Sequence, residues 1–164
     1  MRITENLEVL NSKEIKEIMK HLHEQFGIDE KLDYVFLRNN KDKVYISTRE
    51  LERIDLNSLR IDSIGLYFGK YYTDGFRLTI EGAQLIYSKC KKNVVEISME
   101  QKHEWLQGKD VTLDNVDNSF VILKWKNDIL GCAKVKNGAA LNSIPSSRIL
   151  HVVNEELENT IFEE

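Results

Sequence analysis

The chain has 164 residues, of which 41% are apolar and 30% are charged, and its formal net charge is −4. This composition excludes a disordered or collagen-like chain, and the length excludes a full TIM barrel. The apolar runs are far shorter than the ~20 residues of a membrane span, and the polar first ten residues do not resemble a secretory signal. Cys90 and Cys132 stand alone, so we expect no disulfide framework. We therefore expect a cytoplasmic globular protein.

The first half of the chain mixes helical and strand patterns. Asn11 followed by Glu14 predicts a capping box, and Gly27 is well placed to end the helix that begins there. Apolar residues recur at helical spacing between these points. The segments that follow are strands at 33–38 and 43–48, a short helix at 49–54, strands at 64–72 and 76–80, and a helix at 82–88.

The pattern changes after the basic cluster at residues 89–92, which is the best candidate for a domain boundary. Ser98 with Gln101 predicts a second capping box and a helix to about Gln107. Short strands at roughly ten-residue spacing suggest a small β-barrel. The predicted strands are 93–97, 109–113, 120–126, 129–136, 139–142 and 148–153. The predicted fold class is α+β, with an N-terminal α/β domain (1–90) and a β-rich domain (91–164) that ends in an acidic tail.

The sequence lacks the common catalytic and nucleotide-binding motifs, namely GxxxxGK[ST], GxGxxG, GxSxG and HExxH. His21 and His23 lie two residues apart on a predicted helix, which disfavours a shared metal ion. Cys132 lies in an apolar strand and is interpreted as a buried side chain. Cys90 is flanked by lysines, a setting that lowers the pKa of a thiol. We predict that the protein is not an enzyme and holds neither a cofactor nor a metal ion.

The net charge conceals a basic segment in the second half. Between positions 120 and 148, Asp128 is the one acidic residue. The basic residues of this segment are Lys124, Lys126, Lys134, Lys136 and Arg148. A local field of this kind attracts phosphate groups, although a pI near 5.7 argues against strong non-specific binding of nucleic acid.

Strand register decides whether these lysines form one patch. To stack the apolar residues of the two central strands on one face, Trp125 must lie opposite Ile129, which implies a three-residue loop. In that register Lys124, Lys134 and Lys136 share the opposite, exposed face. A two-residue loop would separate them, and a solvated face without a function is the alternative interpretation.

Two parts of the second half resemble known RNA-binding proteins. Residues 108–111 (GKDV), with 120–123 (FVIL) and 129–135 (ILGCAKV), resemble a PUA domain, the small barrel named after pseudouridine synthases and archaeosine transglycosylases. Residues 137–145 (NGAALNSIP), followed by Arg148, are similar to the RNA-binding tail of Sun-type RNA cytosine methyltransferases. We expect no methyltransferase domain within these 164 residues.

The first half resembles the N-terminal half of the Nip-seven ribosome-biogenesis factors. The resemblance rests on residues 44–47 (VYIS), 68–70 (FGK) and 76–78 (FRL). Those factors are similar in length and place a PUA domain after this half. The resemblance therefore covers almost the whole chain.

These resemblances imply a non-enzymatic adaptor that recognises structured RNA, either ribosomal or transfer RNA, in ribosome biogenesis or RNA modification. No membrane or DNA partner is expected, whereas a ribosome-assembly or RNA-modification protein is. The expected RNA contacts are Gly108, Lys109, Lys134, Lys136 and Arg148, with Lys124 secondary. Lys70 and Arg77 are the expected protein-docking residues. The alternatives are a protein scaffold that uses the aromatic segment 67–72 and an accessory subunit of a separate RNA methyltransferase.

Overall fold

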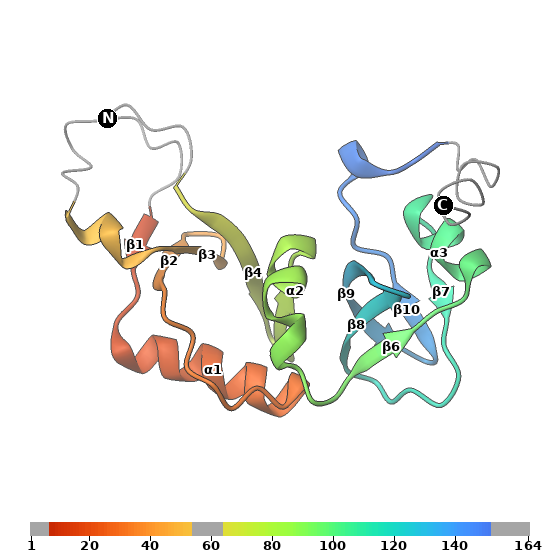
Figure 1. The fold of residues 1–164 in the computed structure, drawn as a ribbon, viewed down its shortest axis with the longest axis horizontal. Helices are drawn as coiled ribbons and strands as arrows, with labels where there is room; N and C mark the ends of the chain where they lie inside the picture. Colours follow the sequence, from red (N-terminus) through yellow and green to blue (C-terminus); the bar gives the residue numbers. More distant parts are fainter. Residues whose placement is uncertain (1–6, 54–63, 152–164) are drawn as a thin grey trace, which may run out of the picture.

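The computed structural model describes residues 7–53 and 64–151, and it contains two five-stranded sheets with helix α2 between them (Figure 1). This arrangement confirms the α+β class. The helices are α1 (Ser12–Phe26), α2 (Ile80–Ile86) and α3 (Met99–Leu106). The strands are β1 (Leu7–Val9), β2 (Val35–Asn39), β3 (Lys43–Ser47), β4 (Leu66–Tyr72), β5 (Gly75–Leu78), β6 (Val94–Glu96), β7 (Val111–Thr112), β8 (Phe120–Trp125), β9 (Asp128–Lys136) and β10 (Ala139–Leu141). Within these two ranges of the chain, no helix has the length and apolarity of a membrane span.

Helix α1 begins and ends where the sequence predicts. The Asn11 side chain accepts hydrogen bonds from the backbone amides of Lys13 and Glu14, at 2.9 and 3.1 Å. The Glu14 carboxylate accepts one from the Asn11 amide at 2.9 Å, which completes the capping box. Gly27 ends the helix with a left-handed φ of 69°. The second predicted capping box, at the start of α3, is also confirmed.

The first sheet runs in the order β1-β2-β3-β4-β5, and every neighbouring pair is antiparallel. One face of this sheet packs against α1, whose Ile18, Leu22 and Phe26 are fully buried. The predicted short helix after β3 is a 3-10 helix at Arg49–Arg53. We refer to β1–α2 as the N-terminal part.

The second sheet runs in the order β6-β8-β9-β10-β7, with β6 and β8 parallel. We refer to the residues from β6 to His151 as the C-terminal part. Trp105 of helix α3 lies in the core of the C-terminal part, where its indole Nε1 donates a hydrogen bond to the Leu130 carbonyl at 3.2 Å. The predicted strand at 148–153 is wrong over its described residues, because Ser146–Arg148 form a 3-10 helix and no strand follows as far as His151. The acidic tail lies outside the described residues.

The turn of the β8–β9 hairpin corrects the predicted register. Trp125 pairs with Asp128, so the loop has two residues instead of the predicted three. Lys126 adopts a left-handed conformation with φ 50°, which two-residue hairpin turns require.

A shift in register next to this turn keeps the lysines on one face. The pairing moves between Leu123 and Lys124, so that Lys124 faces Ile129 and Leu130 becomes the extra residue of a bulge. Leu130, in place of the expected Ile129, joins the core of the C-terminal part. Lys134 pairs with Phe120, four residues before Lys124, so the two lysines still project to the same side.

That side of the hairpin is not the solvated face that the sequence suggests. Phe120, Ile122 and Cys132 lie on it, and all three are buried in the same apolar cluster as Phe36 and Phe68 of the first sheet. The opposite side of the hairpin fills the core of the C-terminal part. The prediction of an exposed lysine face is therefore wrong, because the N-terminal part covers its centre.

Gly69, part of the FGK segment, owes its identity to packing. A Cβ atom at this position would lie 2.4 Å from Cε1 of Phe76 and 2.7 Å from the Arg77 backbone oxygen. Real Cβ atoms do not approach this closely, so a larger side chain requires the buried Phe76 ring and the β4–β5 pair to move.

We predict that Gly69→Ala lowers the free energy of unfolding by about 1–3 kcal/mol, the usual cost of overpacking a core. Urea denaturation of the full chain measures this change. Ser88→Ala, at an exposed position, is the control and should stay within about ±0.5 kcal/mol. An unchanged midpoint for Gly69→Ala would contradict the packing account.

Candidate nucleic-acid interface

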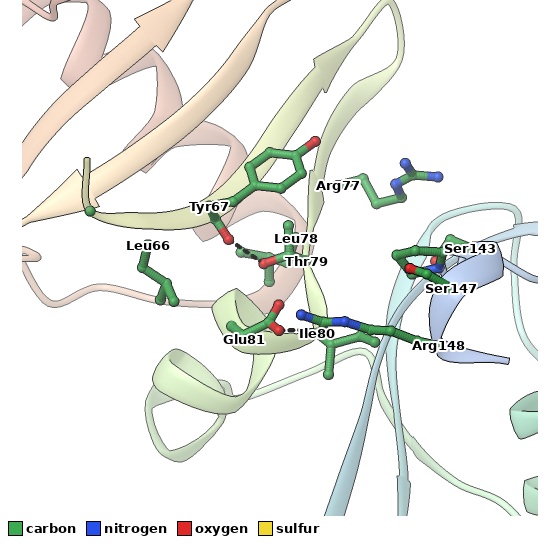
Figure 2. Close-up of a pocket in the computed structure, with 12 residues that line it drawn as sticks. Leu66, Tyr67, Arg77, Leu78, Thr79, Ile80, Glu81, Ser143, Ser147 and Arg148 are labelled. Carbon is green, nitrogen blue, oxygen red and sulfur yellow. Dashed lines mark hydrogen bonds and ion pairs between the residues drawn. The ribbon is translucent and has the colours of Figure 1, made fainter. Parts of the chain in front are cut away.

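A cleft of about 490 Å³ lies between the two parts, beside the start of α2 (Figure 2). Arg77, Thr79 and Glu81 line it from the N-terminal part, and Ser143 and Arg148 from the C-terminal part. The side chain of Arg148 crosses the cleft and pairs with the Glu81 carboxylate (Figure 2). Arg77 and Arg148, for which different roles are predicted, therefore line the same cleft.

The segment that carries Arg148 is held in place by Asn142. The Asn142 Nδ2 donates hydrogen bonds to the carbonyls of Trp105 and Lys109, at 2.7 and 3.0 Å. Its Oδ1 accepts from the Ile144 amide at 2.9 Å. Sequence reasoning gave Asn142 no role of its own, and the one local signal was the preference of asparagine for bonding the backbone two residues ahead.

The same region contains the predicted Gly108 and Lys109. Gly108 has a left-handed φ of 82°, and a Cβ atom there would lie 2.7 Å from Cδ1 of Ile149. The Leu150 amide donates to the Leu106 carbonyl at 2.9 Å. The structure thus brings the 108–109 loop against the residues that follow Arg148, and it leaves the Lys109 side chain exposed.

Lys134 and Lys136 lie at the far end of the hairpin from its turn. Lys134 pairs with Asp74, in the turn between β4 and β5. The hydrogen bond from Lys134, together with its charge, lowers the pKa of Asp74 below the ordinary 3.8. Lys136 is exposed, and no carboxylate among the described residues lies within ion-pairing distance of it.

Lys124 is separated from that pair. At ~3.3 Å per residue, it stands roughly 13 Å along β8 from the residue that faces Lys134. Its Nζ lies 3.5 Å from the Tyr87 hydroxyl and 3.4 Å from a Glu96 carboxylate oxygen. The hydrogen bond to Tyr87 and then the Glu96 carboxylate raise the pKa of Lys124. The three hairpin lysines therefore share a side but do not form one patch.

Lys70 and Arg77, the predicted docking residues, are cross-strand partners in β4 and β5. Both cations lie over the ring of Tyr72, at 5.5 and 4.9 Å from its centroid. Tyr72 is 37% exposed. Their assignment to protein docking remains a prediction.

Neither cysteine has the environment of a nucleophile. Burial raises the pKa of Cys90 to about 11, so the expectation that flanking lysines lower it is wrong. Cys132 is fully buried, as predicted, and burial raises its pKa to about 12. In the part of the chain that the structure describes, no three histidine, cysteine, aspartate or glutamate side chains gather as metal ligands would.

We predict that Lys134→Gln raises the pKa of Asp74 toward 3.8, because the neighbouring cation that favours the carboxylate is lost. A carboxylate with a lowered pKa stabilises the fold above its unfolded-state pKa, and this stabilisation disappears as pH falls through the lowered value. NMR titration of the Asp74 carboxyl carbon in the full chain measures the shift. Lys136→Gln is the matched control, and an equal response to both variants would contradict the pairing.

Comparison with known proteins identifies the kind of domain that each part resembles. The curated relatives include ribosomal RNA small subunit methyltransferase F of Vibrio parahaemolyticus, 24% identical over 141 residues, and that of Shewanella oneidensis, 26% identical over 135 residues. The matches cover 82% and 81% of this chain but 29% and 28% of those relatives, so the chain spans less than a third of their length.

Two family models match, one for each part. Residues 8–80 match the NIP7/UPF0113 pre-PUA domain, and residues 92–150 match the methyltransferase RsmF PUA domain. These matches confirm the resemblance of the first half to the Nip-seven factors and of the second half to a PUA domain. The N-terminal part is therefore similar to a pre-PUA domain of the NIP7 type, and the C-terminal part is similar to the PUA domain of RsmF-type methyltransferases.

Proposed function

We propose that this protein is a non-enzymatic adaptor that binds structured RNA through its PUA domain. The observation that carries the proposal is the contact between the Gly108–Lys109 loop and the Arg148 segment, in a domain that matches a PUA model. This contact places an exposed lysine and an arginine beside backbone that lacks a Cβ atom. Cations reach phosphates from such a surface, whereas the Ile149 side chain takes the space beside Gly108.

The expected RNA contacts can be ranked by whether a carboxylate already pairs with each cation. Lys109 and Lys136 are exposed, and in this proposal they bind phosphates first. Arg148 joins them when a phosphate replaces Glu81 as its partner. Lys134 and Lys124 are secondary, because Asp74 and Glu96 already neutralise them.

The relatives bear on the identity of the RNA. Their names describe methyltransferases that act on small-subunit ribosomal RNA, and this favours ribosomal over transfer RNA as the ligand in the proposal. Their names also favour a more specific form of it, in which the protein supplies RNA affinity to a separate methyltransferase in the cytoplasm. The pre-PUA domain, which we place at residues 1–90, would then orient the PUA domain at 91–164.

We predict that Lys109→Glu with Lys136→Glu weakens binding to purified small-subunit ribosomal RNA by at least about tenfold, or ~1.4 kcal/mol. Loss of two phosphate contacts should also lower the slope of log affinity against log salt concentration by about two units. Filter binding by the full chain over a salt series measures both quantities.

The matched control is Lys13→Glu with Lys16→Glu, which makes the same charge change at exposed positions of α1. It should bind with nearly the affinity and salt slope of the unaltered chain. Equal loss in the two double variants would show a general charge effect and would overturn the proposed site.

A further inference from the structure

A row of three cations crosses the first sheet. Lys43 of β3 pairs in register with Lys70 of β4, and Lys70 pairs with Arg77 of β5. Side chains directly opposite one another on neighbouring strands lie about 5 Å apart at Cβ, and like charges in this arrangement destabilise a sheet. The fold therefore maintains an unfavourable alignment at this place.

Carboxylates do not relieve this alignment. Across the described residues, no carboxylate oxygen lies within 4 Å of the charged nitrogens of Lys43, Lys70 or Arg77. The nearest acidic residue of the β4–β5 turn, Asp74, pairs with Lys134. In the PUA domain, by contrast, Lys124, Lys134 and Arg148 each have an acidic partner.

Tyrosine rings lie beside the row. The Lys43 ammonium is 5.3 Å from the centroid of the Tyr67 ring, and Lys70 and Arg77 lie over Tyr72. Part of the like-charge cost is offset by these cation–π contacts. Cations that follow a backbone, interleaved with aromatic faces, are the arrangement with which proteins hold single-stranded nucleic acid.

We propose that this face, formed by Lys43, Tyr67, Lys70, Tyr72 and Arg77, binds a single-stranded stretch of the RNA whose structured part contacts the PUA domain. The cations bind phosphates, and a base stacks on the exposed ring of Tyr72. The inference rests on the RNA-binding function proposed above and assigns a second contact surface in the pre-PUA domain.

The cleft links the two surfaces. Arg77 ends the cation row and also lines the cleft, opposite Arg148 (Figure 2). Tyr67, which lies beside Lys43 of the row, also lines the cleft. A strand of RNA that leaves the Lys109–Arg148 region therefore meets Arg77 first and then continues across β4 to Lys43.

The test uses the full chain and two probes, single-stranded oligouridylate and purified small-subunit ribosomal RNA. Tyr72→Ala should weaken oligouridylate binding roughly tenfold or more, because a stacked base is lost, whereas Tyr72→Phe keeps the ring and should bind as the unaltered chain does. Replacing Lys43, Lys70 and Arg77 together with Gln should weaken it at least as much. The matched control replaces Lys13, Lys16 and Lys20 of α1 with Gln and should have little effect.

The outcomes separate this inference from the proposed function. Retention of oligouridylate binding by the Lys109→Glu, Lys136→Glu variant, with loss in the Tyr72→Ala variant, supports the second surface. Suppose instead that the unaltered chain binds ribosomal RNA, and that Tyr72→Ala and the variant with Gln at 43, 70 and 77 bind oligouridylate as tightly as the unaltered chain does. The inference is then wrong, and the face is free for a protein partner. If the unaltered chain binds neither probe, the proposed function itself fails. Equal thermal midpoints for Tyr72→Ala and Tyr72→Phe are required before their affinities are compared.

Discussion

The β8–β9 hairpin buries both of its faces, and the arrangement of the whole molecule depends on this. One face completes the core of the PUA domain, and the other places Phe120, Ile122 and Cys132 in the apolar cluster of the pre-PUA domain. Because of this shared cluster, hairpin side chains complete the core of the N-terminal part, whereas the separate core of the C-terminal part consists of its own residues. The shared core fixes the cleft between them and holds Arg77 opposite Arg148.

The same shared core divides the basic residues into two groups. Those near the domain contact, Lys134 and Arg148, pair with carboxylates of the other domain. The side chains of these pairs are 33–53% exposed, so each pair adds little stability. The cations of the first sheet have tyrosine rings as neighbours instead. A net negative chain thus retains local surfaces suited to a polyanion.

Local signals in the sequence predicted the local structure well. The capping boxes of α1 and α3 and the helix end at Gly27 follow from short side-chain patterns that act over a few residues. The hairpin register could not be predicted, because it depends on a left-handed Lys126 and on a bulge that moves Leu130 into the core. The ion-pair partners of Lys134 and Arg148 could not be predicted either, because Asp74 and Glu81 lie more than fifty residues away in the chain. The row of Lys43, Lys70 and Arg77 needed strand pairing to become visible.

We propose that both domains of this protein contact one RNA, and crosslinking in living cells can detect the two contacts in a single experiment. Ultraviolet crosslinking of the full chain, followed by sequencing of the bound RNA and mass spectrometry of the crosslinked peptides, reports the RNA and the contact surfaces together. We expect ribosomal RNA, with crosslinked peptides from the Lys109 loop and the Arg148 segment and from the strand that contains Tyr72. Crosslinked peptides confined to α1, or recovery of RNA no greater than for a protein that does not bind RNA, would contradict it.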